Sequence, residues 1–239
     1  MRNIVARVTD RRAIVGVVGL GHVGMPLCIE LTRLGFNVVG VDVNYRRRAA
    51  LAEGGSYITG IPDSKIADMN NSGRFRLAGI SECVLEAHVV IVSVPTPVSE
   101  NGEPELSDFI DVLRAISVSL RHGSAVFIES TIYPGATRDV ACPILEASQR
   151  KLGQDFFLAY SPARLDPGNE RFSISEIPKV VGADDSASQR VARAFYEQIY
   201  RQVVLVGSSG AAEMTKMVEN TFRIVNIALA NEMKVVAEA

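Results

Sequence analysis

Residues 13–24 read AIVGVVGLGHVG, and this stretch decides the fold. Its apolar first half predicts a buried β-strand over 13–18, and its second half carries three glycines in the spacing G-x-G-x-x-G. In a strand–turn–helix unit Gly19 permits the tight turn, Gly21 lets the backbone approach a diphosphate, and Gly24 lets the helix pack closely on the strand. The stretch therefore predicts a dinucleotide-binding unit. A glycine-rich turn in a fold that binds no dinucleotide is the less favoured alternative.

The helix expected over 22–35 begins inside this motif. Its first N–H groups have no partner within the helix, and the helix dipole adds positive potential at the same end. We therefore expect the diphosphate of a cofactor to lie beside His22 and Val23, next to the three glycines.

Asp42 is the second signal, 18 residues after the last glycine of the motif. It ends the apolar run 38–41, so its carboxylate can accept hydrogen bonds from both hydroxyls of an adenosine ribose. A 2′-phosphate at that place would meet a like charge, and the sequence therefore predicts NAD in preference to NADP. Three arginines at 46–48 keep NADP open, because an arginine here can hold a 2′-phosphate. Arg47 is counted among the predicted cofactor contacts.

The composition is that of an ordinary globular chain with one large domain, or one and a half. Of its 239 residues, 47% are hydrophobic and 22% are charged, and the formal net charge is −2. This near-neutral balance argues against nucleic-acid and membrane-surface partners. No apolar run approaches the roughly 20 residues that a spanning helix needs, and the N-terminus lacks the apolar core of a signal peptide, so we expect a cytoplasmic protein.

The three cysteines, Cys28, Cys83 and Cys142, are odd in number and far apart. None lies near a histidine or a second cysteine at the spacing of metal ligands, so we expect buried free thiols and no metal site. The sequence offers no cysteine that is visibly prepared for catalysis.

Short β-rich runs alternate with helical patterns, which is typical of a parallel sheet covered by helices on both faces. Strands are expected near 13–18, 37–42, 88–94, 124–130, 155–160, 178–182 and 202–206. Helices are expected near 22–35, 44–54, 107–121, 135–152 and 185–200, with a last one from 208 or 209. The segment 55–80 is expected to be a loop with one short helix. The usual order would place the first and fourth of these strands side by side, with the ligand crevice beyond their carboxyl ends.

The predicted fold class is therefore α/β, a doubly wound parallel sheet of the Rossmann type. This domain is expected over 1–207 and runs into a long C-terminal helix over 208–239.

Polar motifs follow two of the expected strands. Pro95-Thr96-Pro97 ends the strand at 88–94, where the prolines stiffen the exit and the threonine hydroxyl is expected to face the crevice. Glu129-Ser130-Thr131 ends the next strand, and Pro134-Gly135 opens a helix, which offers hydroxyls and helix N–H groups on the far side. Each motif alone is more often a stiff turn or a helix cap. Together they favour a nicotinamide site contacted by Pro95, Thr96 and Thr131.

The last helix carries polar residues at helical spacing. Glu213, Lys216, Asn220 and Arg223 lie along one face, and apolar side chains occupy another. An amphipathic surface helix would show the same pattern. On a helix that follows the last strand of a nucleotide-binding fold, however, a lysine in a partly dry crevice can stabilise an alkoxide or relay a proton. An asparagine one turn away can fix a water or a sugar oxygen.

A fifth motif makes the pattern specific. The loop Tyr160-Ser-Pro-Ala-Arg-Leu-Asp-Pro-Gly-Asn169 follows the expected strand at 155–160. With GLGHVG, VPTP, ESTIYPG and EMTKMVENTFRIVNIALANE in this order, nearly the whole chain resembles the nucleotide-sugar 6-dehydrogenases, the UDP-glucose and GDP-mannose dehydrogenase family. The proline-glycine form of the loop is more similar to the branch that acts on UDP-N-acetylhexosamines than to the UDP-glucose branch.

The resemblance implies a reaction and a set of roles. The family oxidises the C6 alcohol of a UDP-sugar to a carboxylate with two NAD molecules in succession, and a cysteine thiolate traps the aldehyde. Lys216 and Asn220 would support the developing oxyanion, Thr131 would position water or the nicotinamide ribose, and Thr96 would lie against the cofactor. Substrate contacts are expected from Arg164, Lys216, Asn220 and Arg223. The helix at 208–239 would be the central helix through which a homodimer forms.

Two departures from the family pattern affect activity. The family loop reads Ser-Pro-Glu-Arg, with the glutamate in acid–base work and thioester hydrolysis, whereas this chain has Ala163 at that position. The family's nucleophilic cysteine lies beyond the central helix, and this chain ends at Ala239 inside that helix. We therefore expect the cofactor-binding half of a longer enzyme, without the UDP-binding domain and inactive alone.

Two other functions are alternatives. In the β-hydroxyacid dehydrogenases, a similar dinucleotide fold runs into a helix with Lys-x-x-x-Asn, and the lysine acts without a cysteine. Lys216 could serve a simple hydroxy acid in that way. The second alternative is a non-enzymatic NAD-binding or assembly module, which Ala163 and the expected missing half favour.

Overall fold

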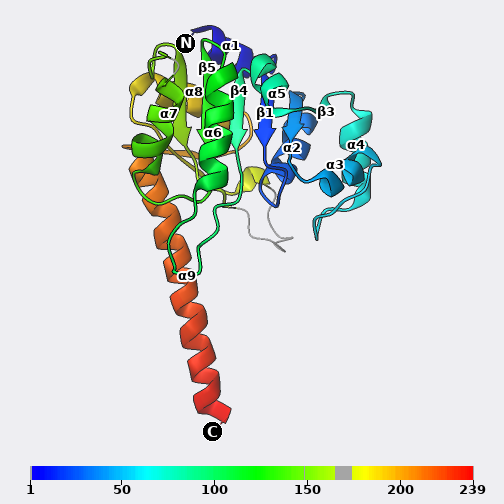
Figure 1. Ribbon diagram of the computed structural model, residues 1–239. Helices are drawn as coiled ribbons and strands as arrows, with labels where there is room; N and C mark the ends of the chain where they lie inside the picture. The colour runs from blue at the N-terminus through cyan, green and yellow to red at the C-terminus, as the bar shows by residue number, and fades with distance from the viewer. Residues whose placement is uncertain (1, 148, 165–173, 239) are drawn as a thin grey trace.

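One eight-stranded sheet forms the centre of the computed structural model, counted over the residues that the structure describes: 2–147, 149–164 and 174–238 (Figure 1). The strand order is β3-β2-β1-β4-β5-β6-β7-β8, and all neighbours are parallel except β6 and β7. The strands are β1 (Ile14–Val18), β2 (Asn37–Val41), β3 (Phe75–Leu77), β4 (Val89–Val92), β5 (Ser124–Ile128), β6 (Phe156–Tyr160), β7 (Lys179–Gly182) and β8 (Val203–Val206). The predicted fold class is confirmed.

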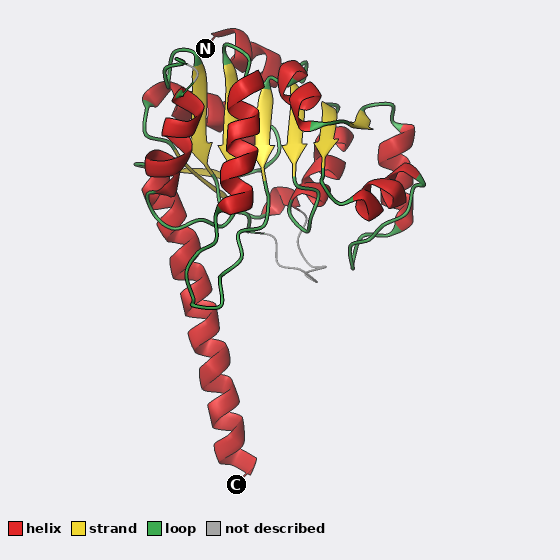
Figure 2. Cartoon of the chain, in the orientation of Figure 1, coloured by secondary structure: helices red, strands yellow, loops and turns green. Residues whose placement is uncertain are grey.

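Helices cover both faces of the sheet (Figure 2). Because successive side chains of a strand point to opposite faces, Phe127 packs into one apolar core and its neighbour Val126 into the other. The first core also takes residues from α1 (Arg2–Thr9), α2 (Gly24–Arg33), α4 (Asp63–Asn71) and α8 (Ser186–Tyr196). The second takes residues from α5 (Ile80–Glu86), α6 (Ser107–Ser119) and α7 (Cys142–Glu146). Burial on both faces explains why the strands read as valine- and isoleucine-rich runs.

The last helix, α9 (Ser209–Glu238), starts against the sheet and then leaves it. Asp184 caps its first turn, since the backbone N–H of Ser209 donates to Asp184 Oδ1 at 3.1 Å and the Ser209 hydroxyl donates to Oδ2. Ala212 and Glu213 are buried, whereas every described residue from 221 onward is exposed. The helix projects beyond the carboxyl ends of the strands (Figure 2).

Two predictions about the sheet were wrong. The first and fourth strands are neighbours, as the usual order predicts, but the fourth strand is β4 and not 124–130, because the prediction missed the three-residue strand β3. The chain order therefore reverses between β1 and β4. The strand at 178–182 was expected to be parallel, but β7 pairs with β6 in the antiparallel sense. A parallel return usually contains a crossover helix, and the described part of this connection holds only the 3₁₀ turn Ile174–Glu176.

The helices differ from prediction at three places. The helices α1 and α5 were not predicted, and each is only about two turns long, with eight and seven residues. The single helix expected over 135–152 is a π-helical turn, Thr137–Ala141, followed by the short α7. Pro143 stands in the first turn of α7 and has no N–H to donate to the preceding turn, so the hydrogen-bond ladder changes register there. The helix α3 (Tyr45–Ala52) lies where it was expected, and Asn44 caps it.

A buried ion pair joins three elements beneath the carboxyl edge. Lys179 Nζ on β7 lies 3.0 Å from Glu129 Oε2 at the end of β5, and both side chains are 2% exposed. Tyr196 of α8 donates from its hydroxyl to Glu129 Oε1 at 2.8 Å, and Lys179 Nζ also donates to the carbonyl of Pro162 at 3.3 Å. Each charge thus has several partners, which a buried ion needs.

Removing one member of this pair should destabilise the protein strongly. Lys179→Met leaves the Glu129 carboxylate without its cation, and we expect a loss of about 3–5 kcal/mol in the free energy of unfolding, measured in urea. The matched control is Arg193→Met at the exposed pair with Glu197, where the loss should be below about 1 kcal/mol. Equal losses in the two variants would contradict a structural role of the buried pair.

Candidate functional site

The glycine turn between β1 and α2 is built on close backbone approaches. Gly19 has a φ of +94°, and a Cβ there would lie 2.6 Å from the carbonyl oxygen of Ser93 at the end of β4. A Cβ on Gly24 would lie 1.9 Å from the carbonyl oxygen of Gly19. Side chains are therefore excluded at both positions, which is the turn and packing geometry that the motif predicts.

The same turn leaves donors and space for an anion. Around Gly21 the nearest atom to an added Cβ is Arg47 Nη1, 4.0 Å away. Within the described part of the chain, the backbone N–H groups of Gly21, His22 and Val23 have no hydrogen-bond acceptor. Free N–H groups at the start of a helix are a suitable site for a diphosphate, so these residues fit the cofactor that the motif predicts.

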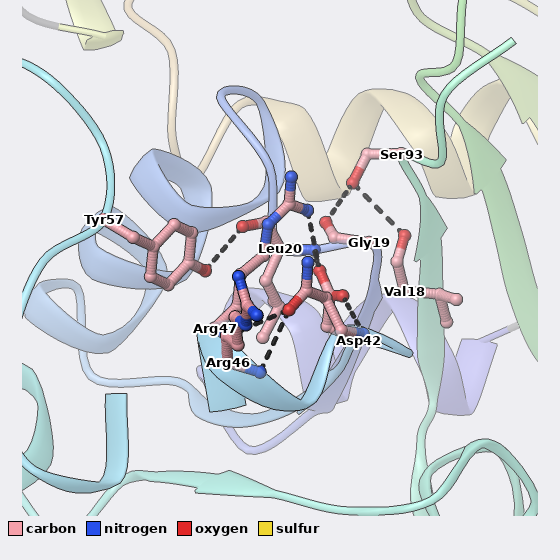
Figure 3. Close-up of polar contacts among 9 residues, drawn as sticks. Val18, Gly19, Leu20, Asp42, Arg46, Arg47, Tyr57 and Ser93 are labelled. Atoms are coloured by element: carbon pink, nitrogen blue, oxygen red, sulfur yellow. Dashed lines mark hydrogen bonds and ion pairs between the residues drawn. The ribbon is translucent and has the colours of Figure 1, made fainter. Parts of the chain in front are cut away.

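Asp42 lies at the end of β2, beside the glycine turn (Figure 3). Its Oδ2 accepts hydrogen bonds from the Leu20 backbone N–H at 2.9 Å and from Arg47 Nη1 at 3.2 Å, and its Oδ1 accepts from the Asn44 N–H at 2.8 Å. The side chain is only 4% exposed, and that of Arg47 is 38% exposed. The structure thus brings Asp42 and Arg47 together as an ion pair, with the arginine on the solvent side.

The ends of β4 and β5 lie side by side, as predicted, but their hydroxyls are used internally. Thr96 donates from its hydroxyl to the carbonyl of Thr131, and Ser130 donates to the carbonyl of Val94 at 2.8 Å. Ser93 donates to the carbonyl of Gly19 at 2.8 Å, which ties this edge to the glycine turn. The Thr96 hydroxyl, expected to face the crevice, thus lies next to Thr131 and is joined to it by this hydrogen bond. Pro95 is exposed at the same edge.

The helix N–H groups expected to serve a ligand after Pro134 are already occupied. Glu213 of α9 is fully buried, and its carboxylate accepts from the backbone N–H of Gly135 and, at 2.8 Å, from that of Thr137. The expectation of a second open helix end was therefore wrong. Sequence reasoning placed Glu213 on the polar face of the helix but missed this role, since its partners lie 76 and 78 residues away.

The predicted acid–base lysine lies at the start of a groove along α9. Lys216 Nζ donates a hydrogen bond of 2.8 Å to the carbonyl of Ala163, in the loop after β6. Burial, followed by the nearby Arg223 cation, lowers the pKa of Lys216. Asn220, one turn further on, is half-buried, and its amide has no hydrogen-bond partner among the described residues.

The groove has a volume of about 580 Å³. Its lining residues are Arg164, Ile177, Lys216, Glu219, Phe222, Arg223, Asn226, Ile227 and Ala230. Arg164 Nη2 forms an ion pair of 2.6 Å with Glu219, and both residues line the groove. Three of the four predicted substrate residues are thus brought together, whereas Asn220 does not line this groove. Residues 165–169 of the predicted loop motif lie outside the described residues.

The cysteines show no activated thiol. Burial raises the pKa of Cys28, raises that of Cys83 to about 12, and raises that of Cys142 to about 11. Cys142 is half-buried rather than buried as expected. No cluster of histidine, cysteine and carboxylate side chains suited to a metal ion, and no helix long and apolar enough to cross a bilayer, is found over the described ranges.

Comparisons with known proteins place the chain in a family. Residues 13–203 match the NAD binding domain of the UDP-glucose/GDP-mannose dehydrogenase family, and residues 210–239 match its central domain. The chain therefore belongs to the UDP-glucose/GDP-mannose dehydrogenase family. This confirms the resemblance that the motifs predicted, and NAD as the cofactor of the domain.

Individual relatives agree with the expected branch. The chain is 36% identical over 229 residues to a UDP-N-acetyl-D-glucosamine 6-dehydrogenase of Pseudomonas aeruginosa, a match that covers 93% of this chain and 52% of the relative. It is 35% identical to a UDP-N-acetyl-D-mannosamine dehydrogenase of Methanocaldococcus jannaschii, a match that covers 93% of this chain and 51% of the relative. The structure of a UDP-D-ManNAc dehydrogenase of Pyrococcus horikoshii superposes with a TM-score of 0.85 at 31% identity. The superposition covers 92% of this chain and 52% of that structure. The chain thus spans about half the length of these relatives.

Asp42 should decide the choice between NAD and NADP. A carboxylate about 4 Å from a phosphate repels it by up to roughly 4 kcal/mol near a protein surface before salt screening, so calorimetry should show tighter binding of NAD. Asp42→Asn keeps an acceptor oxygen but removes the charge, so it should lower the ratio of NAD to NADP affinity by at least about tenfold. Asp42→Ala should also weaken both dinucleotides, because the Leu20 and Asn44 N–H groups lose their acceptor. Equal affinities in the unchanged chain would refute this role.

Proposed function

We propose that the chain supplies the NAD-binding and proton-handling residues of a UDP-sugar 6-dehydrogenase, with a UDP-N-acetylhexosamine as the preferred substrate. The observation that carries the proposal is the half-buried Lys216 amine, with its lowered pKa, at the start of a groove on the carboxyl side of an NAD-binding sheet. The names of the relatives supply the substrate class.

The residues of the sheet edge would bind and orient the dinucleotide. The glycine turn would hold the diphosphate on the free N–H groups of His22 and Val23, and Asp42 would accept from the adenosine ribose. Thr96 and Thr131, which are joined by a hydrogen bond, would form the wall at the nicotinamide end. Bound NAD supplies the hydride acceptor.

The residues of α9 would handle the alcohol. A lysine whose pKa is lowered gives up its proton more readily, so it can take the proton from an alcohol and return it, which is worth roughly 10²–10⁴ in rate. Its present acceptor, the carbonyl of Ala163, shows that the amine reaches the loop after β6. Asn220 would fix a water or the sugar oxygen, and Arg164 and Arg223 would add positive charge for an anionic diphosphate.

Ala163 and the thiols limit what these residues can do by themselves. The side chain of Ala163 is a buried methyl group where the family places a glutamate, and it cannot transfer a proton. All three thiols have raised pKa values, so none is a ready thiolate for trapping an aldehyde. We infer that the 239 residues alone do not complete the oxidation.

The test is NADH formation together with mass analysis of the product from three proteins. The chain itself and its Ala163→Glu variant should form no uronic acid from any UDP-sugar, because catalytic groups that act as a unit are not restored singly. A third protein would join the Ala163→Glu chain to the C-terminal part that the relatives possess. It should oxidise UDP-N-acetylhexosamine faster than UDP-glucose. Uronic acid from the first protein would overturn the roles given to Ala163 and the thiols, and inactivity of the third toward every UDP-sugar would refute the function.

The outer part of α9 supports a homodimer as the proposed assembly. Phe222 and Leu229 are 73% and 58% exposed, and they belong to an apolar stripe that monomers seldom present to water. A second copy could cover it with the same stripe. Light scattering at tens of micromolar should therefore show a dimer, and Phe222→Glu with Leu229→Glu should yield the monomer. A clean monomer for the unchanged chain would contradict this assembly.

A further inference from the structure

Tyr57 contacts the glycine turn, although it belongs to none of the motifs quoted above. It lies between α3 and α4, in the segment 55–80 that the sequence predicted to be mostly loop. Its hydroxyl donates a hydrogen bond of 2.6 Å to the carbonyl of Leu20, which stands between the first two glycines of the motif (Figure 3). The side chain is partly buried.

This hydrogen bond fixes the orientation of one peptide group. The peptide unit is planar and trans, so the Leu20 carbonyl and the Gly21 N–H point in opposite directions. A carbonyl held by Tyr57 therefore turns the Gly21 N–H away from the tyrosine. The peptide before Leu20 is held as well, because the Leu20 N–H donates to Asp42 Oδ2 at 2.9 Å. Glycine has the widest backbone freedom of all residues. The hydrogen bond from Tyr57 therefore restricts a conformation that Gly21 would otherwise leave variable.

The ring of Tyr57 makes a second contact. The guanidinium of Arg47 lies over it, 5.6 Å from the ring centroid, while Arg47 Nη1 bonds Asp42 Oδ2 at 3.2 Å. A cation over an aromatic face is attracted by the ring quadrupole. The ring and the carboxylate thus hold Arg47 in one place, next to the open side of Gly21.

The Tyr57 hydroxyl stays a donor at physiological pH. Burial, followed by the neighbouring Asp42 carboxylate, raises the pKa of Tyr57, and Arg47 only partly offsets this. The proton needed for the bond to the Leu20 carbonyl is therefore retained.

We propose that Tyr57 is a positioning residue for the adenosine half of NAD. Its hydroxyl sets the Leu20–Gly21 peptide that faces the diphosphate, and its ring keeps Arg47 paired with Asp42, away from a 2′-phosphate. The inference rests on the NAD site proposed above. The two contacts have different consequences, since NAD and NADP share the diphosphate and differ only in the 2′-phosphate.

Calorimetry with NAD and NADP separates the two contacts. Tyr57→Phe removes only the hydroxyl and should weaken both dinucleotides by up to about tenfold, because the peptide order that this hydrogen bond supplies before binding must then be gained on binding. Tyr57→Leu also removes the aromatic face, so Arg47 is released and the ratio of NAD to NADP affinity should fall, whereas Tyr57→Phe should leave that ratio unchanged. In an Arg47→Ala background, Tyr57→Leu should no longer change this ratio. The ring acts through Arg47, so the effects of the two substitutions are coupled and do not add.

Two controls distinguish positioning from general stability. Tyr45→Phe alters another tyrosine, which is exposed on α3 and accepts a hydrogen bond from Arg46, and should leave both affinities unchanged. In amide NMR spectra of Tyr57→Phe without ligand, the Leu20 and Gly21 signals should shift while those of the distant strands β5 and β6 stay in place. Shifts spread through the sheet would indicate a merely structural role and would overturn the inference.

The outcomes also separate this inference from the proposed function. If the unchanged chain binds no NAD, the cofactor site is refuted and the inference with it. If the unchanged chain binds NAD, and Tyr57→Phe binds NAD and NADP with the same affinities as the unchanged chain does, the inference alone is refuted. If Tyr57→Leu lowers the ratio of NAD to NADP affinity in the Arg47→Ala background as well, the role of the ring is refuted. Tyr57→Phe retains the buried ring and carries the test should Tyr57→Leu fail to fold.

Discussion

Burial of the strands on both faces is the constraint on which the rest of this structure depends. Side chains of β5 alternate between two apolar cores, so neither face of the sheet can hold a polar ligand. Polar chemistry is left to the carboxyl edge, where the chain order reverses between β1 and β4. The glycine turn, the threonines after β4 and β5, and the start of α9 all lie at or beside this edge. One edge therefore collects residues that are more than 190 positions apart in the sequence.

Many polar groups at this edge hold the edge itself together. Glu129, Lys179 and Tyr196 satisfy one another beneath the loop after β6, and Glu213 fastens α9 to the turn at Gly135. These contacts place the carbonyl of Ala163 where the Lys216 amine meets it. Such rigidity matters at a catalytic site, because a misplacement of about 1 Å can cost about a hundredfold in rate. The structural carboxylates thus support the groups to which we assign chemistry.

The sequence was sufficient wherever a local rule applied. The strand–turn–helix unit, Asp42 at the end of β2 and the polar face of α9 follow from glycine spacing, apolar runs and helical periodicity, and the structure contains all three. Contacts between distant segments were not predictable in this way. The Tyr57 hydroxyl meets the Leu20 carbonyl across 37 residues, and no pattern in the sequence marks that pair. The short strand β3 and the antiparallel pairing of β7 were missed for a related reason, since three residues carry little periodicity and strand direction depends on the connection.

Two helix starts carry similar sequence signals but differ in what meets their backbone N–H groups. Both follow a strand of the parallel sheet and a glycine with positive φ, Gly19 in one case and Gly135 in the other. At the second, Glu213 brings its own carboxylate to the free N–H groups, so the positive end of the helix is neutralised from within the chain. At the first, no acceptor within the described residues reaches Gly21, His22 or Val23. Of these two helix starts, the first leaves unpaired donors for an anionic ligand among the described residues, which supports our proposal that the diphosphate binds at the turn after β1.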